Sequence, residues 1–300
     1  MATATTTRTD VYTRVTSHIV AELERGVRPW LKPWNAENAA GRITRPLRHR
    51  GQQYQGINIM MLWASAERQG YSCPFWLTFQ QEKQLGGHVK KSEPGAHVVY
   101  ATTFKKKEQS EDGSETEAEI PFLKEYTVFN AEQCEGLPNH YYTLAEPPIE
   151  TIERIEHVEA YFANTKADIR TGGNRAYYAI EGDYVKLPPL ETFRNAEAHA
   201  ATLAHEMTHW TRHQTRLNRE FGRKRWGDEG YAMEELVAEL GSAFLCADLH
   251  ITPEIRDDHA AYIAEWLKVL KDDKRAIFSA ASHASKAVEY LHGLQPQPAA

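Results

Sequence analysis

The residues best suited to chemistry lie between Ala204 and His213, in the sequence AHEMTHWTRH. Within this stretch His205, Glu206 and His209 form an H-E-x-x-H pattern. Residues four apart in a helix project from one face, one turn apart, so both imidazoles can bind the same metal ion. Glu206 is next to a ligand without being one, where a carboxylate can take a proton from attacking water. The pattern predicts a metal site for hydrolysis.

A zinc site of this kind needs a third protein ligand, and residues 233–247 (MEELVAELGSAFLCA) offer three glutamates. Helical geometry separates them. Glu235 and Glu239, four residues apart, share a face beside the apolar stripe of the predicted helix, whereas Glu234 points about 100° further round. The spacing therefore predicts Glu235 or Glu239 as the third ligand and makes Glu234 the least suitable.

The elements before the motif form a mixed α and β half. Apolar residues at four-residue intervals from Val11 to Leu23 predict a helix that ends at Gly26, and residues 57–69 predict a second helix. A short strand at 75–77 and a helix opened by the capping box of Thr78 follow. Two further segments, 97–104 and 122–129, are predicted to form a long hairpin.

The elements of the second half are mainly helical. A helix at 152–164 and a hairpin of residues 176–180 and 184–187 precede the motif helix, and three more helices follow it. Residues 135–150 are rich in proline and lack periodicity, which is typical of a linker. We predict an α+β protein: a small mixed domain at 1–140, then a largely helical domain with a short antiparallel sheet at 141–300.

Composition and charge support two domains with different tasks. The 300 residues, 41% of them hydrophobic, suffice for two modest cores. Residues 1–107 hold 16 Lys and Arg against 7 Asp and Glu, whereas the rest of the chain holds 19 against 34. A basic half attracts a polyanion such as nucleic acid, although a mixed surface without a partner has the same composition.

The basic half contains residue types that bind single-stranded nucleic acid, namely aromatic rings for base stacking and cations for phosphates. Trp30 and Trp34 lie beside cations and prolines, where they can stack bases or fill a small core. The arginines of the loop at 41–51 suit phosphates, or they are a solvated surface. The residues that we select as DNA-binding candidates are Trp30, Trp34, Arg45, Arg48, Tyr54, Asn58, Lys90 and Lys91.

The sequence has no feature of a membrane or exported protein. No stretch approaches the ~20 apolar residues that span a bilayer, and the first residues lack a signal pattern. The three cysteines, Cys73, Cys134 and Cys246, are widely spaced without a C-x-x-C pair, which predicts buried thiols. We expect a cytoplasmic protein without a membrane partner.

Several segments together resemble the ArdC-type antirestriction proteins of conjugative plasmids, which are related to TraC-type primases. The segments are WLKPW at 30–34, YQGIN at 54–58, WLTF at 76–79, HEMTHW at 205–210 and residues 231–240. The resemblance implies a single-stranded-DNA-binding N-terminal domain and a zincin-like metallopeptidase domain similar to SprT and Spartan proteases. It further implies a protein that shields incoming plasmid DNA from host restriction during conjugation, with restriction-modification subunits as substrate or target.

The same resemblance implies roles at the metal site. Glu235 in Glu235-x-x-Ala238 resembles the third ligand of zincins whose second helix carries E-x-x-A, which leaves Glu239 to hold a ligand histidine by a hydrogen bond or to replace Glu235. Spartan-type sites use a third histidine, so a glutamate here is a departure. The expected metal is zinc or manganese. The alternative is a protein that coats single-stranded DNA or sequesters the restriction enzyme without catalysis, with the zincin fold retained.

Overall fold

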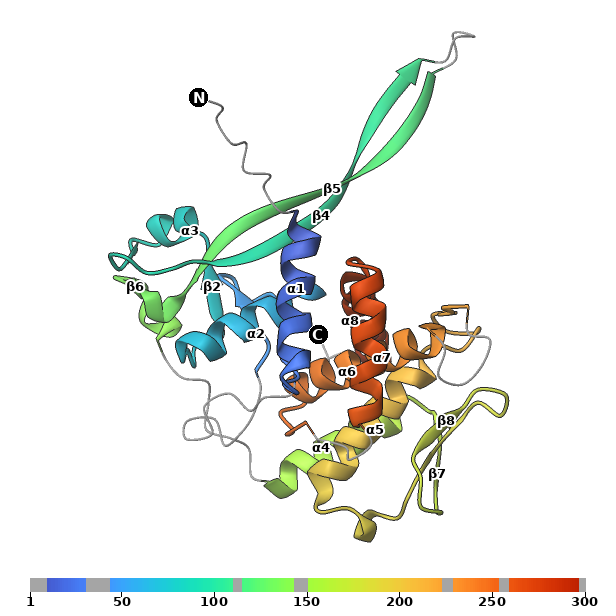
Figure 1. Ribbon diagram of the computed structural model, residues 1–300. Coiled ribbons are helices and arrows are strands. Elements are labelled where there is room, and N and C mark those ends of the chain that lie inside the picture. The colour runs from blue at the N-terminus through green and yellow to red at the C-terminus, as the bar shows by residue number, and fades with distance from the viewer. Residues whose placement is uncertain are drawn as a thin grey trace. The chain divides into compact units, whose positions relative to one another are not determined.

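A computed structural model of the protein describes residues 10–30, 44–109, 115–142, 151–222, 229–253 and 259–296 (Figure 1). The chain forms two compact units. Unit 1 comprises Met1–Pro46, Gln53–Ser72 and Leu144–Ala300, and unit 2 comprises Leu47–Gln52 and Cys73–Thr143. These units differ from the continuous division into 1–140 and 141–300, because the first two long helices belong with the C-terminal half.

Those two helices form where their apolar periodicity predicts them. Helix α1 (Val11–Glu24) begins at Asp10, whose side chain accepts a hydrogen bond from the Thr13 amide at 3.2 Å. Helix α2 (Ile57–Gln69) ends at Gly70, whose φ of 75° is the left-handed conformation that glycine adopts without strain. Their buried faces lie against the C-terminal helices α7 (His259–Asp272) and α8 (Ala276–Gly293), respectively. The periodicity identifies the buried face but not the element that covers it.

The centre of unit 1 is a helical bundle. Helix α6 (Glu229–Asp248) packs against α8 and against α5 (Ala196–Trp210), which α4 (Thr151–Asn164) also contacts (Figure 1). A Cβ atom on Gly241 of α6 would lie 2.5 Å from Cγ2 of Thr208 on α5. Any side chain at 241 would therefore push α5 and α6 apart, and the glycine permits their close approach.

A small mixed sheet completes unit 1. Its strands β7 (Asp168–Thr171), β9 (Tyr184–Leu187) and β8 (Tyr177–Ala179) lie in that order, with β8 antiparallel and β7 parallel to β9. The predicted hairpin corresponds to β8 and β9. Strand β7 was not predicted, because all four of its residues are exposed and give no alternating pattern.

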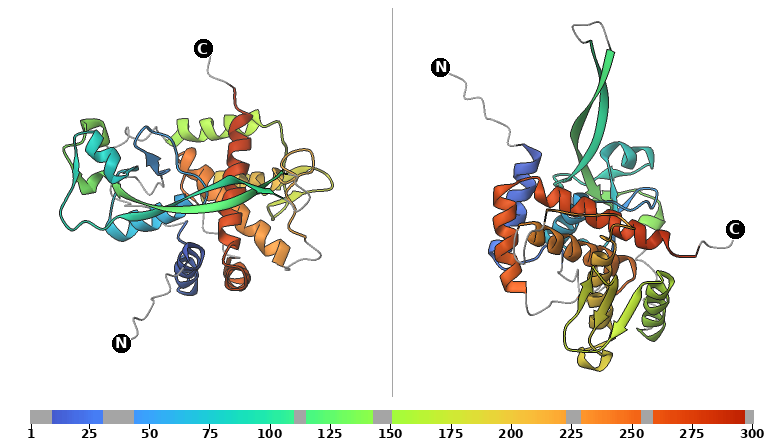
Figure 2. Two further views of the ribbon diagram at one scale, coloured as in Figure 1. Left: turned by 90° about the horizontal axis from the view of Figure 1, so that it is seen from above. Right: turned by 90° about the vertical axis from the view of Figure 1, so that its right-hand side faces the viewer.

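Unit 2 is built around a four-stranded sheet in the order β1-β2-β5-β4. Strands β4 (Ala96–Gln109) and β5 (Glu115–Asn130) form a long twisted ribbon, teal to green in Figures 1 and 2, which extends beyond the hairpin predicted at 97–104 and 122–129. The remaining elements of unit 2 are β1 (Leu47–Arg48), β2 (Phe75–Leu77), α3 (Phe79–Gln84), β3 (His88–Val89) and β6 (Cys134–Glu135). Short 3-10 turns lie at Ala131–Gln133 and Asn139–Tyr141 in unit 2 and at Leu190–Thr192 in unit 1.

The cysteines lie inside this fold, and none of its described helices could span a membrane. All three cysteines are buried and free, as predicted. Burial raises the pKa of Cys73 to about 11 and that of Cys134 to about 12, so both thiols are protonated at neutral pH. Among the described residues no helix is long and apolar enough to cross a membrane.

Candidate metal centre

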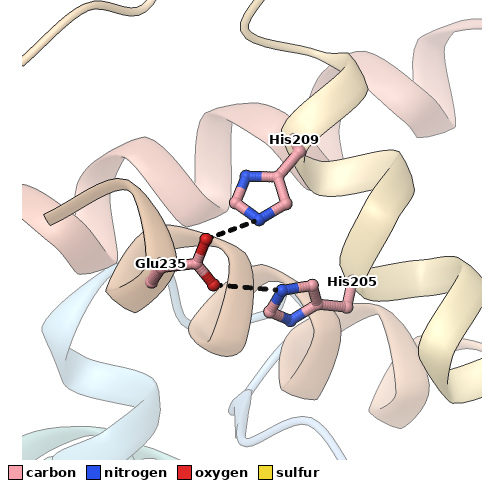
Figure 3. A group of neighbouring side chains, drawn as sticks. All are labelled: His205, His209 and Glu235. Atoms are coloured by element: carbon pink, nitrogen blue, oxygen red, sulfur yellow. Dashed lines mark ion pairs between the residues drawn. The ribbon is translucent and has the colours of Figure 1, made fainter. Parts of the chain in front are cut away.

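Helices α5 and α6 bring three potential ligands together. His205 and His209 project from α5, and Glu235 of α6 points between them (Figure 3). The carboxylate oxygens of Glu235 lie 3.6 Å from Nε2 of His205 and 3.5 Å from Nε2 of His209. One donor atom from each residue lies within 4.8 Å of the other two. Two imidazoles thus direct their Nε2 atoms at the same carboxylate.

This donor set fits a divalent transition metal. Imidazole nitrogen and carboxylate oxygen are ligands of zinc and manganese, and three protein ligands are typical of a catalytic zinc site that keeps one position open. In the described parts of the chain this is the one group of three such side chains close enough to share an ion. Glu206, which follows His205 on α5, is buried. The ligand and base roles of these four residues remain predictions.

Each histidine also has a carboxylate behind it, at the nitrogen away from Glu235. Nδ1 of His209 lies 3.0 Å from Oε1 of Glu234, and Nδ1 of His205 lies 3.8 Å from Oε1 of Glu239. A carboxylate at Nδ1 holds the proton there and leaves the Nε2 lone pair free to bind a metal. Glu239 lies near His205, but 3.8 Å is longer than a hydrogen bond, so its hydrogen-bonding role stays a prediction. The angular argument set Glu234 aside as a ligand and did not identify it as the residue that orients His209.

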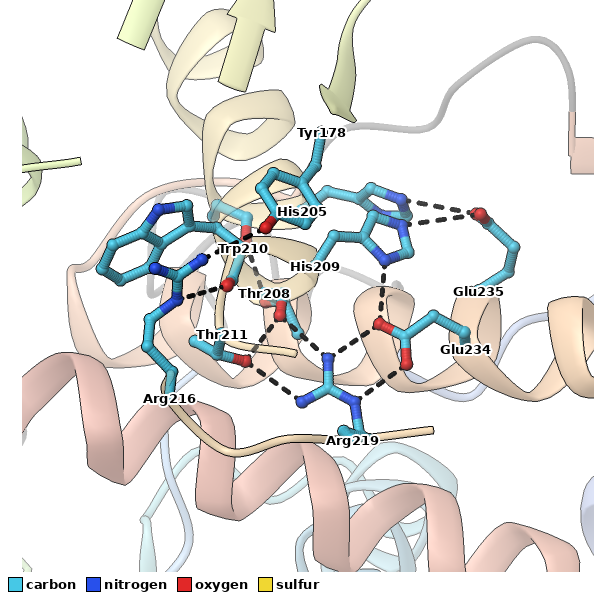
Figure 4. Close-up of polar contacts among 11 residues, drawn as sticks. Tyr178, His205, Thr208, His209, Trp210, Thr211, Arg216, Arg219, Glu234 and Glu235 are labelled. Atoms are coloured by element: carbon cyan, nitrogen blue, oxygen red, sulfur yellow. Dashed lines mark hydrogen bonds and ion pairs between the residues drawn. The ribbon is translucent and has the colours of Figure 1, made fainter. Parts of the chain in front are cut away.

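A buried arginine fixes Glu234 (Figure 4). Nε and Nη2 of Arg219 each donate to one carboxylate oxygen of Glu234 at 2.8 Å. The guanidinium also donates to Oγ1 of Thr211 at 3.1 Å and to the backbone oxygen of Thr208 at 3.0 Å. Burial alone would raise the pKa of Glu234, but Arg219 and His209 lower it to about 2. Glu234 is therefore a carboxylate at physiological pH.

The carboxylates in turn change the titration of His209. Burial alone would lower its pKa, yet the charge of Glu235 and the hydrogen bond to Glu234 raise it to about 10. The two histidines hold the pKa of Glu235 well below its usual range. Without a metal, His209 therefore carries a proton on both ring nitrogens at neutral pH. A metal ion that binds Nε2 must displace the proton on that nitrogen.

A second arginine joins the motif helix to the sheet. Nε of Arg216 donates to the backbone oxygen of Trp210 at 2.7 Å, and its guanidinium lies 3.8 Å from the centre of the Trp210 ring (Figure 4). The same guanidinium bonds both carboxylate oxygens of Asp183 in the β8–β9 turn and the Tyr178 hydroxyl of β8. Arg216 and Arg219, which follow the motif in the sequence, thus both pair with carboxylates inside the fold.

The structure corrects three of the DNA-binding candidates. Trp30 is fully buried, with its ring centroid 5.9 Å from that of Trp266, so it fills the core and is not available to bases. Arg45 is buried and donates from Nη2 to Asp248 at 3.0 Å, which neutralises its charge. Tyr54 is buried as well. An aromatic or cationic residue type does not reveal burial, and all three lie in unit 1.

The other candidates differ in their exposure. Arg48, Lys90 and Lys91 are exposed and belong to unit 2, and Nζ of Lys90 donates to the backbone oxygen of Glu132 at 2.9 Å. Asn58 is partly buried on α2. Trp34 lies outside the described residues. The exposed cations that remain as candidates are therefore three residues of unit 2.

Comparison with known proteins identifies two family domains along the chain. A model of the N-terminal domain of anti-restriction factor ArdC matches residues 9–129, and a model of a zincin-like metallopeptidase matches residues 156–283. The metal-free crystal structure of the antirestriction ArdC protein from plasmid R388 is 44% identical, with a TM-score of 0.80. The match covers 95% of this chain and 97% of that chain. This chain belongs to the ArdC family of antirestriction proteins.

Other members and relatives extend the comparison. The ArdC protein of R388 also has a Mn(II)-bound structure, which matches at 43% identity with a TM-score of 0.77 over 95% of this chain and 98% of that one. An uncharacterized protein, y4eC of Sinorhizobium fredii (strain NBRC 101917 / NGR234), is 41% identical over 96% of this chain and 94% of its own length. DNA primase TraC of Escherichia coli is 33% identical over 93% of this chain, which spans only 26% of the primase.

The ArdC family assignment bears on the metal. A zincin-like domain and a Mn(II)-bound relative support a divalent metal ion in this family. The α+β fold class predicted from the sequence is confirmed by the structural match.

Proposed function

We propose that this ArdC-family protein is a metallopeptidase that also binds single-stranded DNA and protects incoming DNA from host restriction during conjugation. The observation that carries the enzymatic part is the convergence of His205, His209 and Glu235 beside the buried Glu206. A metal with only a structural role is usually closed by four protein ligands and needs no base beside it. Three ligands and an adjacent carboxylate are what hydrolysis requires.

His205, His209 and Glu235 would hold the ion, with zinc favoured by the nitrogen-rich ligand set and manganese supported by the relative. When bound, the ion supplies Lewis acidity that makes water more acidic and polarises a peptide carbonyl. Glu234 keeps the Nδ1 proton of His209 in place by a hydrogen bond, and Glu239 places its negative charge near Nδ1 of His205. The site therefore presents its nitrogen lone pairs in a fixed orientation.

Glu206 is the group that moves the proton. In our proposal its carboxylate accepts a proton from the attacking water and afterwards donates it to the amine that leaves the cleaved peptide. Strand β8 is one of the two edge strands of the small sheet, and the hydrogen bond between Tyr178 and Arg216 connects it to the end of the motif helix. An extended peptide could pair with its open edge and so be held beside the metal. The proposed substrate is therefore an unfolded or flexible segment of a protein.

The DNA-binding part of the proposal concerns unit 2 and its exposed cations. Arg48, Lys90 and Lys91 can neutralise backbone phosphates, which is the main source of affinity for single strands. Incoming plasmid DNA meets the restriction enzyme in the cytoplasm, where we place this protein. The subunits of a host restriction-modification system are the proposed substrate or binding target.

A rival function from a different class uses the same fold. The protein could coat single-stranded DNA or sequester a restriction enzyme, with the metal site retained for stability alone. The two functions differ in their need for Glu206, because binding does not require proton transfer. The buried Glu206 and the open three-ligand arrangement favour the peptidase.

The Glu206→Gln substitution tests the proposal, because it removes proton acceptance and keeps the size of the side chain and all three ligands. Purified wild-type and variant protein would be loaded with zinc or manganese and incubated with restriction subunits, with and without single-stranded DNA. We expect equal metal content in both, cleavage only by the wild type, and loss of restriction protection in cells expressing the variant. Full protection by Glu206→Gln would establish the rival function.

A further inference from the structure

Each ligand histidine lies next to a glutamate of α6, and each of these glutamates in turn lies next to an arginine from outside helices α5 and α6. For His209 the groups are Glu234 and Arg219, in contact at 2.8 Å. For His205 they are Glu239 and Arg28. The first arginine comes from the segment that follows the motif helix. The second comes from a part of the chain about 180 residues before the motif.

Arg28 is placed to act on Glu239. Its Nη1 atom lies 3.9 Å from Oε2 of Glu239, whose Oε1 atom lies 3.8 Å from Nδ1 of His205. The side chains of Arg28 and Glu239 are only 8% and 6% exposed. Little solvent separates the charges, so the attraction is far stronger than that of a surface pair. The two oxygens of one carboxylate therefore connect the arginine to the histidine.

Residues 28–30 are also connected to the neighbourhood of the metal site through aromatic rings. The ring of Trp30 contacts Trp266 at 5.9 Å, and Trp266 stacks on Tyr262 at 6.2 Å. Tyr262 in turn contacts Tyr231, with ring centroids 6.1 Å apart and hydroxyl oxygens 2.9 Å apart. Tyr231 lies one turn before Glu235 on α6. A series of aromatic contacts thus connects Trp30 to Tyr231, one helical turn from Glu235.

We propose that Arg28 is a positioning residue of the metal centre, which holds Glu239 against His205, and that the N-terminal segment at residues 28–30 thereby sets the affinity for the metal. The inference rests on the proposed metal site. It has a consequence for the organisation of the chain, because the zincin-like match covers residues 156–283 and does not include Arg28. The metallopeptidase site is then completed by the N-terminal part of the chain.

The affinity of full-length protein for Mn²⁺ and for Zn²⁺, measured by calorimetric titration at fixed pH and salt, tests this role. We expect Arg28→Ala to weaken both affinities roughly tenfold, which is at the lower end for residues that orient a metal ligand. Arg28→Lys keeps the charge and should recover most of the loss. Arg25→Ala is the matched control, because Arg25 pairs with Glu22 on the exposed side of the same segment. Its affinity should equal that of the wild type.

A double-mutant cycle separates positioning from a general effect on the fold. If Arg28 acts through Glu239, then Arg28→Ala should change the affinity of the Glu239→Gln protein by less than about twofold, because the shared interaction is already lost. Thermal unfolding of the metal-free proteins identifies variants that have lost their fold, and Arg28→Met, which keeps the aliphatic length, replaces Arg28→Ala in that case.

Two results would overturn the inference: a wild-type affinity in Arg28→Ala, or a full tenfold loss on top of Glu239→Gln. Glu235→Ala distinguishes this failure from a failure of the site itself. If Glu235→Ala loses the metal while Arg28 variants bind it normally, the site stands and only the positioning role is wrong. If Glu235→Ala binds the metal normally, the site is wrong.

Discussion

The metal centre and the segment from Arg45 to Tyr54 both contain buried charges, but they arrange them differently. At the metal centre two histidines direct equivalent nitrogens at one carboxylate. Near Arg45 a single carboxylate, Asp248, receives Arg45, Gln53 and His292, each at 3.0 Å. The first arrangement gathers several metal-binding groups around one point. The second pairs each of these three side chains with one carboxylate inside the fold.

This difference shows what separates a binding site from a structural ion pair. A site for a cation brings several lone pairs close together, and the bound metal ion relieves their mutual repulsion. In the absence of the metal ion a proton can take its place, as on His209 here. In a structural ion pair the two charges already compensate each other, so the pair does not require a bound ion. The residues around Arg45 therefore stabilise unit 1, and the following predictions test this contrast.

The largest effect is expected at the third ligand. Glu235→Ala should abolish stoichiometric metal binding, because two imidazoles alone hold a divalent ion weakly. Glu239→Ala should weaken binding roughly ten- to a hundredfold, since it removes only the support of His205. Metal analysis of the purified variants after dialysis measures both. The opposite order would make Glu239 the ligand and remove the contrast between the ligand and its support.

The next effect separates Arg45 from Arg48. Breaking the buried pair with Asp248 by Arg45→Ala should lower the free energy of unfolding by about 3–5 kcal/mol, because Asp248 keeps a buried charge. Arg48 is exposed, so Arg48→Ala should leave stability within about 0.5 kcal/mol of the wild type. Urea unfolding provides the measurement. An Arg45→Ala protein of normal stability that binds single-stranded DNA poorly would return Arg45 to the DNA-binding surface.

The proton on His209 predicts a pH dependence of metal binding. The pKa of His209 is raised to about 10, so the metal-free site must release a proton when an ion binds at neutral pH. Affinity should therefore rise by up to tenfold per pH unit between pH 6.5 and 9. Calorimetry in buffers of different ionisation enthalpy counts the released protons. An affinity that is independent of pH in this range would show that His209 is already neutral.

The same raised pKa affects the metal-free fold with the opposite sign. A group whose pKa is higher in the folded protein stabilises it fully below its unfolded value near 6.5, and this contribution disappears as the pH rises through about 10. Metal-free protein should accordingly unfold at a lower temperature at pH 10 than at pH 7. His209→Ala is the control, and it should lose this part of the pH dependence.

The smallest effect is expected for the exposed lysines of unit 2. Lys90→Ala with Lys91→Ala should weaken binding to single-stranded DNA several-fold and make it less sensitive to salt, because fewer counterions are released. Lys268→Ala with Lys271→Ala is the matched control, since these lysines are also exposed but lie in unit 1. Fluorescence anisotropy at several salt concentrations compares the two. An equal loss in both double variants would mean that general charge, and not unit 2, binds the DNA.

The sequence was most informative where local spacing carries the information. The H-E-x-x-H pattern, the capping box at Thr78 and the apolar periodicity of the first two helices depend on contacts within one or two turns, and the structure contains these elements. The family resemblance added the choice of Glu235 among three glutamates. The helical period alone left that residue and Glu239 equivalent, because it specifies directions around an axis and not the position of the neighbouring helix.

Only the tertiary structure decided which residues are covered, and by what. Trp30 and Arg45 have the residue types of a DNA surface, but their partners, Trp266 and Asp248, lie more than 200 residues further along the chain. Glu234 can orient His209 because Arg219, in the loop that follows α5, holds the Glu234 carboxylate by a hydrogen bond. The sequence by itself determined the helices, their apolar faces and the two histidines. The packing of those faces determined the rest, because burial depends on contacts between distant parts of the chain that no local period encodes.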